Sequence, residues 1–149
     1  MVDFYNPIAI ASDHAGFCLK EYIKEKLLDE GFIFNDFGTF SKESMDYPDT
    51  VHPLAKAIQD KKFSGGIIIC GSGNGVAMVA NKYRDIRAAV CWNEEITRLS
   101  RQHNNANVIA LPARFLAQEE AEKLVKTFFT TGFEGGRHER RMIKISEVL

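Results

Sequence analysis

The residues best suited to chemistry lie in one stretch, Cys70-Gly71-Ser72-Gly73-Asn74-Gly75. Glycines at alternate positions allow the backbone to adopt positive φ, which brings successive N–H groups toward one point. Such a cradle at the start of a helix suits a phosphate or an oxyanion. A tight strand-to-helix turn with a small buried cysteine explains the same residues, and this stretch alone favours neither interpretation.

Three better-known motifs do not match this stretch. A dinucleotide fingerprint starting at Gly71 needs a third glycine at position 76, and a phosphatase loop of the C-x5-R type needs an arginine there. That residue is Val76. A response-regulator receiver needs an acceptor aspartate where Cys70 stands. What remains is a cysteine where a strand meets a helix N-terminus, and the field at that place favours the thiolate.

Other polar groups have a structural and a functional interpretation each. Asp13-His14 enters a helix, where a cap with a solvent-facing imidazole is the simpler explanation. Residues 101–105 end a predicted helix, where a positively charged side chain interacts favourably with the helix dipole. Arg137 and Arg141 lie at i and i+4 of the basic C-terminal segment, so they share one side if it is helical. They form either a solvated basic face or a phosphate clamp, for which the arginine fork is suited.

Short apolar runs alternate with amphipathic segments, which predicts strands and helices in turn. The expected strands are 7–11, 32–37, 66–70, 87–92 and 107–111; the expected helices are 17–30, 49–61, a short one ending at Lys82, one capped by Asn93, and one with Ala117, Ala121, Leu124, Val125 and Phe128 on its apolar face. This order indicates an α/β fold with a parallel sheet covered on both faces. Ligands in such folds lie beyond the carboxyl ends of the strands. That rule selects the loops that follow the first, third and fifth strands.

Composition narrows the class of protein. We expect the 149 residues to form a single domain, 1–149. The net charge of −1 argues against nucleic acid or an anionic membrane as a partner. Three cysteines, none in a C-x-x-C pair, indicate a reducing compartment. With no secretory signal and no apolar run near the roughly 20 residues that span a bilayer, we expect a cytoplasmic protein.

Taken together, several blocks resemble ribose-5-phosphate isomerase type B and its relatives, in the same order along nearly the whole chain. They are Ser12-Asp13-His14-Ala15-Gly16, Asp46-Tyr47-Pro48, the 70–75 stretch, Ala80-Asn81-Lys82, Ser100-Arg101-Gln102-His103-Asn104, Arg114 and Gly136-Arg137-His138. The resemblance implies a Rossmann-like three-layer sandwich around five parallel strands. It also implies a homodimer or dimer of dimers, without metal or cofactor, that interconverts ribose 5-phosphate and ribulose 5-phosphate in the pentose phosphate pathway.

The same resemblance assigns roles to residues. Cys70 would move the proton between C1 and C2 of the sugar, and His103, with Asn104 beside it, would assist opening of the furanose ring. Some relatives replace the cysteine by a glutamate at the position of Val76, so the presence of Cys70 here supports it as the base. The implied substrate-binding residues are Asp13 for the sugar hydroxyls, Gly71, Ser72, Gly73, Asn74 and Gly75 for the enediolate, and His14, Arg114, Arg137 and Arg141 for the phosphate.

Two alternatives stay open, and one geometric expectation follows. A hexose phosphate, allose or galactose 6-phosphate, would need only a longer pocket, and a non-catalytic phospho-ligand binding module would use the same glycine cradle. The helix before His103 has roughly ten residues and carries the chain about 15 Å from the edge that holds Cys70. We therefore expect each site to be shared between two subunits of a homo-oligomer.

Overall fold

The computed structural model describes residues 4–147, and within them five parallel strands form one sheet in the order β2-β1-β3-β5-β4. The strands are β1 (Ile8–Ser12), β2 (Phe34–Asp36), β3 (Gly66–Cys70), β4 (Ala88–Val90) and β5 (Val108–Pro112). In the register, Cys70 pairs with Pro112 and Ser12 pairs with Ile69. The carboxyl ends of β1, β3 and β5 therefore lie side by side at one edge of the sheet.

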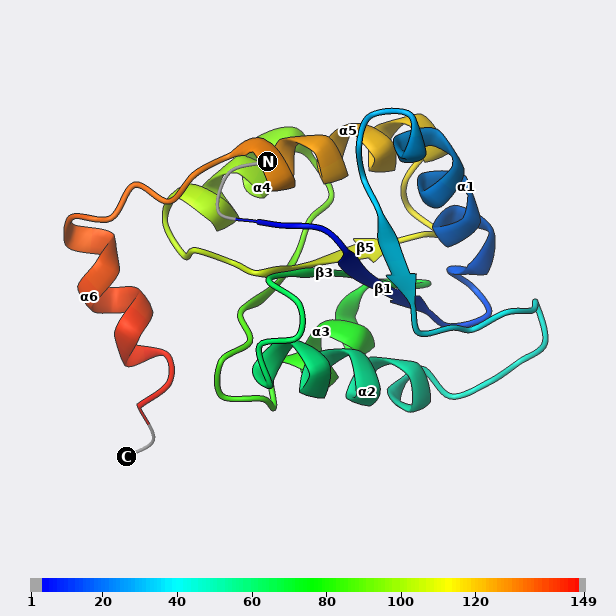
Figure 1. Cartoon of the computed structure of the whole chain (residues 1–149), viewed down its shortest axis with the longest axis horizontal. Helices are drawn as coiled ribbons and strands as arrows, with labels where there is room; N and C mark the ends of the chain where they lie inside the picture. The colour runs from blue at the N-terminus through cyan, green and yellow to red at the C-terminus, as the bar shows by residue number, and fades with distance from the viewer. Residues whose placement is uncertain (1–3, 148–149) are drawn as a thin grey trace.

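Helices cover both faces of this sheet, as Figure 1 shows. One layer contains α1 (Phe17–Leu28), α4 (Glu94–Gln102) and α5 (Gln118–Thr130), and the other contains α2 (Pro48–Gln59) and α3 (Asn74–Ala80). Every residue of β1, β3 and β5 is buried, because these strands are covered from both sides. The predicted α/β fold, a three-layer sandwich around five parallel strands, is confirmed.

The predicted element boundaries agree with the structure to within a few residues. The strand over 66–70 matches β3, and the Asn93 side chain accepts a hydrogen bond from the Ile96 N–H at 2.9 Å, so it caps α4 as expected. Ala117 was wrongly placed on the apolar face of α5. It is exposed and precedes the first turn of that helix, and Phe129 is buried instead.

A buried ion pair stabilises the carboxyl ends of β1 and β2. Lys20 is fully buried, and its Nζ lies 2.6 and 2.7 Å from the two carboxylate oxygens of Asp36. Burial alone would raise the pKa of Asp36, but hydrogen bonds from Lys20, Lys24 and the Gly38 N–H hold that pKa below its ordinary value. The Gly38 carbonyl in turn accepts the Ser12 N–H at 2.7 Å. The carboxyl end of β1 is thereby attached to the end of β2.

The last helix, α6 (Arg137–Lys144), stands apart from the three layers, at the left edge of Figure 1. The Ser146 hydroxyl, just after it, donates to the Arg84 carbonyl at 3.2 Å. Two large apolar side chains of this region, Ile143 and Ile145, are more than half exposed. This region therefore presents apolar surface that residues 4–147 leave uncovered.

Candidate active site

A cavity of about 520 Å³ opens at the carboxyl edge of β1, β3 and β5. Its walls come from the loops that follow these three strands, with one residue from the start of α2. The lining residues are Asp13, Tyr47, Cys70, Gly71, Ser72, Gly75, Arg114 and Phe115. The structure thus brings together six of the residues singled out in the sequence, at the edge where the strand-end rule placed a ligand.

Cys70 occupies the floor of this cavity as the last residue of β3. Its side chain is 5% exposed, and its Sγ accepts a hydrogen bond from the Gly73 N–H at 3.2 Å. The loop therefore directs a backbone donor at the sulfur atom. The thiol thus lies at the boundary between the core and the cavity.

The other two cysteines have different surroundings, and all three are free. Cys91 is fully buried, and burial raises the pKa of its thiol, which keeps it neutral. An isolated cysteine within a helix usually packs as a small hydrophobe, but Cys18 lies on the exposed side of α1. Cys70 is the cysteine that lines the cavity.

The three glycines after Cys70 have two different local surroundings. Gly73 has φ of 77°, a left-handed conformation that favours glycine, whereas Gly71 and Gly75 have none of the positive φ values found in the described chain. A Cβ at Gly75 would lie 2.5 Å from the Tyr47 ring, and one at Gly71 would lie 3.1 Å from Nη1 of Arg114. The alternate pattern therefore permits one turn and two close approaches, and the expectation of positive φ holds for Gly73 alone.

Asp13 and His14 follow β1 into α1. Asp13 is 7% exposed, and its Oδ1 accepts the Gly16 N–H at 3.0 Å, so one carboxylate oxygen holds the turn. His14 Nδ1 accepts the Met45 N–H at 3.2 Å, which leaves its Nε2 as the nitrogen that carries the proton in the neutral ring. His14 is half-buried beside the cavity residue Asp13 but does not itself line the cavity.

Gly73 and Asn74 belong to the same loop as Cys70 without lining the cavity, whereas His103 and Asn104 lie at the opposite edge of the sheet. His103 caps the C-terminus of α4, and Asn104 lines a second cavity of about 480 Å³ together with Arg87, Ala88 and Ala106, which stand at the amino ends of β4 and β5. Strands of five residues rise about 3.3 Å per residue, so roughly 15 Å separates the two edges. Within one chain, the structure does not bring His103 to Cys70.

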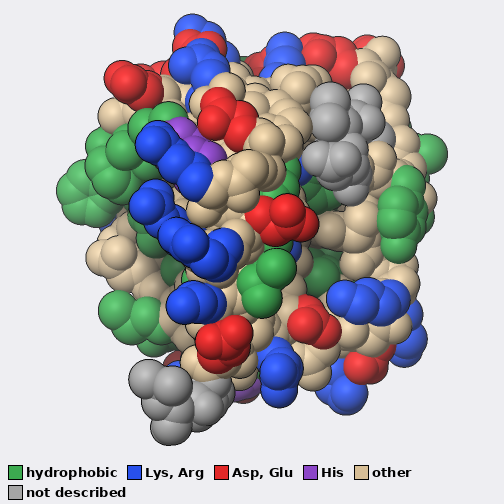
Figure 2. All heavy atoms as spheres, turned by 90° about the vertical axis from the view of Figure 1, so that its left-hand side faces the viewer, with side chains coloured by type: hydrophobic (Ala, Val, Ile, Leu, Met, Phe, Trp, Pro, Cys, Tyr) green, Lys and Arg blue, Asp and Glu red, His purple; other side chains and the backbone are tan. Residues whose placement is uncertain are grey.

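Arg137 and Arg141 are both on α6, so the helical spacing expected for them is confirmed. Figure 2 shows Lys and Arg side chains gathered on the face of the molecule that carries this helix. The exposed cations of α6 are Arg137, Arg140, Arg141 and Lys144. Neither of the two predicted arginines lines the Cys70 cavity among the residues that the structure describes.

Beside His103 lies His138, a residue for which the sequence predicted no role. The imidazole of His138 stacks on that of His103, with ring centroids 4.1 Å apart and an interplanar angle of 9°. Burial, followed by the charges of His103 and Arg137, holds the pKa of His138 below its ordinary value, in spite of Glu134. The feature of the sequence that could have indicated this role is the position of His138 directly after Arg137, at the start of the same basic segment.

Comparison with known proteins identifies the family of this chain. The model of the Ribose/Galactose Isomerase family matches residues 8–145. The chain belongs to the ribose/galactose isomerase family. The chain is also 40% identical over 141 residues to ribose-5-phosphate isomerase B of Escherichia coli (strain K12), and the alignment covers 95% of each protein. The resemblance inferred from the sequence blocks is thereby confirmed.

Two solved structures of ribose/galactose isomerase relatives have the same fold. A ribose 5-phosphate isomerase from Thermotoga maritima is 50% identical, with a TM-score of 0.93 over 95% of this chain and 98% of that one. Ribose-5-phosphate isomerase B from Mycoplasma genitalium, solved with bound ribulose-5-phosphate, is 42% identical, with a TM-score of 0.90 over 94% of this chain and 93% of that one. The family fold therefore extends over nearly the whole chain.

Two lining residues of the cavity were not among the predicted site residues of this family member. The Tyr47 ring packs against Gly75, and Phe115 follows Arg114 with 74% of its surface exposed. Tyr47 precedes the proline that starts α2, so the sequence around it indicates only a helix boundary. Its role as a wall depends on the packing of α2 against α3, which sequence spacing does not report.

Proposed function

We propose that this chain is an aldose–ketose isomerase that interconverts ribose 5-phosphate and ribulose 5-phosphate. The observation that carries the proposal is the cavity that combines the Cys70 thiol, the glycine-rich loop and Arg114 at one sheet edge. Membership of the ribose/galactose isomerase family and the likeness to a relative solved with ribulose-5-phosphate support the substrate class.

The proposed reaction moves one proton between neighbouring carbons. The Cys70 thiolate takes the proton from C2 of the open-chain aldose, and the electrons of that C–H bond form the C1–C2 double bond of an enediolate. The O2 proton then passes to O1, and the Cys70 thiol returns its proton to C1, which leaves a ketone at C2. A base placed within reach of the proton accelerates such a transfer by about 10²- to 10⁴-fold.

The loop from Gly71 to Gly75 stabilises the charge that develops on oxygen. Backbone N–H groups fixed before the reaction cost no reorganisation when the oxyanion forms, and each donor contributes a few kcal/mol, on the order of 3. The Ser72 hydroxyl is exposed at the cavity wall and adds a donor, and Asp13 accepts hydrogen bonds from the sugar hydroxyls. These groups act on the reacting end of the sugar.

The ring-opening step is assigned to His103, with Asn104 beside it. Since these residues lie roughly 15 Å from the Cys70 edge of their own chain, we place them in the site of a partner subunit. The exposed Ile143 of α6 and Ile145 just after it supply apolar surface for a second copy of the chain. In the resulting homodimer, or dimer of dimers, each site combines the two sheet edges of different subunits.

Four side chains are proposed to hold the phosphate, namely those of His14, Arg114, Arg137 and Arg141. Arginine suits this task because its planar fork donates two parallel hydrogen bonds to a phosphate. Binding energy from the phosphate, which does not react, keeps the small sugar in register with the thiol.

Three free cysteines and a thiol base are suited to a reducing compartment, so we place the activity in the cytoplasm. Across residues 4–147, no helix has the length and apolar composition needed to cross a membrane.

An isomerisation assay tests the proposed function directly. We expect turnover of ribose 5-phosphate, with a higher kcat/KM than for allose 6-phosphate or galactose 6-phosphate measured in parallel. A preference for either hexose phosphate would keep the reaction and change the substrate. Tight binding of all three sugars without turnover of any would instead identify a non-catalytic binding module.

The phosphate clamp predicts a specific pattern on α6. Arg137→Ala or Arg141→Ala is expected to raise KM roughly 10- to 100-fold, because each loses a hydrogen bond between two charged groups worth about 1.5–3 kcal/mol. Arg140→Ala is the matched control, since it removes an exposed arginine of the same helix that has no proposed role. Initial rates over a range of ribose 5-phosphate concentrations separate KM from kcat. If the three variants have equal KM values, α6 is only a solvated basic face.

A further inference from the structure

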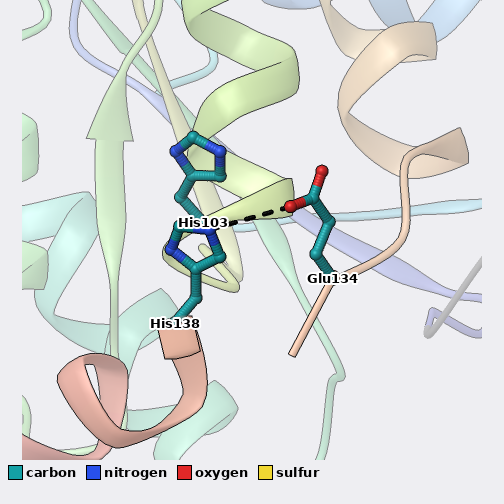
Figure 3. A group of neighbouring side chains, drawn as sticks. All are labelled: His103, Glu134 and His138. Carbon is teal, nitrogen blue, oxygen red and sulfur yellow. Dashed lines mark ion pairs between the residues drawn. The ribbon is translucent and has the colours of Figure 1, made fainter. Parts of the chain in front are cut away.

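Three metal-binding side chains meet beside α6, outside the Cys70 cavity. His103 comes from the end of α4, His138 from the first turn of α6, and Glu134 from the connection between α5 and α6 (Figure 3). One donor atom from each side chain lies within 4.8 Å of the other two, and Nε2 of His138 is 3.7 Å from Oε2 of Glu134. Segments from three places in the chain therefore supply two imidazoles and one carboxylate to one point.

We propose that His103, Glu134 and His138 form a binding site for Zn²⁺ or a similar late first-row divalent cation, and that occupancy of the site inhibits the isomerase. Two histidines and a glutamate are a donor set that Zn²⁺ uses, with a fourth position left open to water. The inhibitory half rests on the proposed function, because the cation would occupy the imidazole assigned to ring opening. The binding half is independent of that function.

The site requires a small local rearrangement. The lone pair of an imidazole nitrogen lies in the ring plane, so the parallel rings of His103 and His138 cannot both point at one ion while they are stacked. Rotation of one ring about its Cβ–Cγ bond removes this obstacle, and that torsion has a broad energy minimum. Bonds of about 2.0 Å to Zn²⁺ also need the donors roughly 3.3 Å apart, so the widest separation in the cluster has to contract by up to about 1.5 Å.

The surroundings allow this contraction. The Glu134 side chain is 51% exposed and free to turn, while its backbone N–H donates to the Gln102 carbonyl at 3.0 Å and keeps the segment against the end of α4. The carboxylate offsets part of the repulsion that the nearby Arg137 exerts on a cation. The ion would replace the imidazole stack and join α6 to the end of α4.

Binding is measured first, on full-length protein freed of metal with EDTA and then desalted. Isothermal titration with Zn²⁺ is run in a Cys18→Ser/Cys70→Ala background, because thiolates also bind Zn²⁺. We expect one Zn²⁺ per chain, at least 10-fold weaker binding in Glu134→Gln and in His138→Asn, and unchanged binding in Glu139→Gln, which alters an exposed carboxylate of α6 outside the cluster. Equal affinity in all of these variants would overturn the site.

Inhibition is measured second, in proteins that keep Cys70. We expect Zn²⁺ to inhibit the protein with the native cluster and EDTA to restore its rate, whereas Glu134→Gln should turn over normally and resist Zn²⁺. Inhibition that persists in Glu134→Gln would overturn the inhibitory half and locate the effect at another ligand such as the Cys70 thiol. If Zn²⁺ binds the cluster yet leaves the rate unchanged, the site stands, but the inhibitory half and the catalytic role of His103 are both wrong.

Discussion

Replacing Cys70 by alanine is expected to lower kcat for ribose 5-phosphate by about 10²- to 10⁴-fold, the usual contribution of a positioned base. KM should change little, because the residues assigned to the phosphate and the sugar hydroxyls are intact. The fold should also survive, since the change removes one sulfur atom at the cavity floor. Steady-state kinetics and a thermal unfolding curve of the same preparation test these three statements together.

Cys91→Ala is the matched control for this variant. Cys91 is the second buried cysteine, and its raised thiol pKa makes it a poor base, so its loss should leave kcat unchanged. Turnover near the wild-type rate in Cys70→Ala would remove the thiol from the mechanism. A reduced rate in the control as well would point to a packing effect that any buried cysteine produces.

Alkylation gives an independent measurement of the same thiol. Iodoacetamide also reaches the exposed Cys18, so the experiment uses a Cys18→Ser background. Inactivation should follow carboxamidomethylation of Cys70 as read by mass spectrometry, and ribose 5-phosphate should slow both. Inactivation that precedes labelling of Cys70 would contradict its role.

The parts of the molecule that the sequence predicted well depend on local patterns. The run from Gly66 to Cys70 is apolar at every position between glycine and cysteine, and a short run of this kind is typical of a strand covered on both faces. Because parallel strands end at the same edge, the loops after β1, β3 and β5 had to meet. That single rule placed Asp13, Cys70 and Arg114 in one cavity.

The parts that the sequence did not predict depend on contacts between distant segments. Cys18 is exposed because its side of α1 faces away from the sheet, although an isolated cysteine in a helix suggests burial. Tyr47 becomes a cavity wall only because Gly75 has no side chain to exclude it. The stack of His138 on His103 requires α6 to return to the end of α4, more than thirty residues away, and no periodicity reports such a return.

The separation of Cys70 and His103 has a consequence for the quaternary structure. Cys70 ends β3, whereas α4 runs back across the sheet and leaves His103 at the opposite edge. Side chains cannot span the roughly 15 Å between the two edges. If both residues act in one reaction, they come from two subunits, and an isologous dimer provides two such sites.

Mixing two inactive variants tests this shared site. Cys70→Ala and His103→Ala chains are co-refolded in equal amounts, with EDTA present to remove metal ions. Half of the dimers are then mixed, and each mixed dimer has one site with both native residues, so about a quarter of the wild-type activity should return. If both residues act within one chain, every site carries one lesion and the activity stays at that of the parents.

A second mixture measures how much wild-type activity is lost when the two models predict different losses. Wild-type chains are co-refolded with the double variant Cys70→Ala/His103→Ala, again in equal amounts. If the sites are shared, each of the two sites in a mixed dimer has one altered residue, so only wild-type dimers are active and about a quarter of the activity remains. If each site forms within one chain, about half of the activity remains. Native mass spectrometry verifies that mixed dimers make up half of each sample. Half activity in this mixture, together with no recovery in the first, would show that each subunit contains its own complete site.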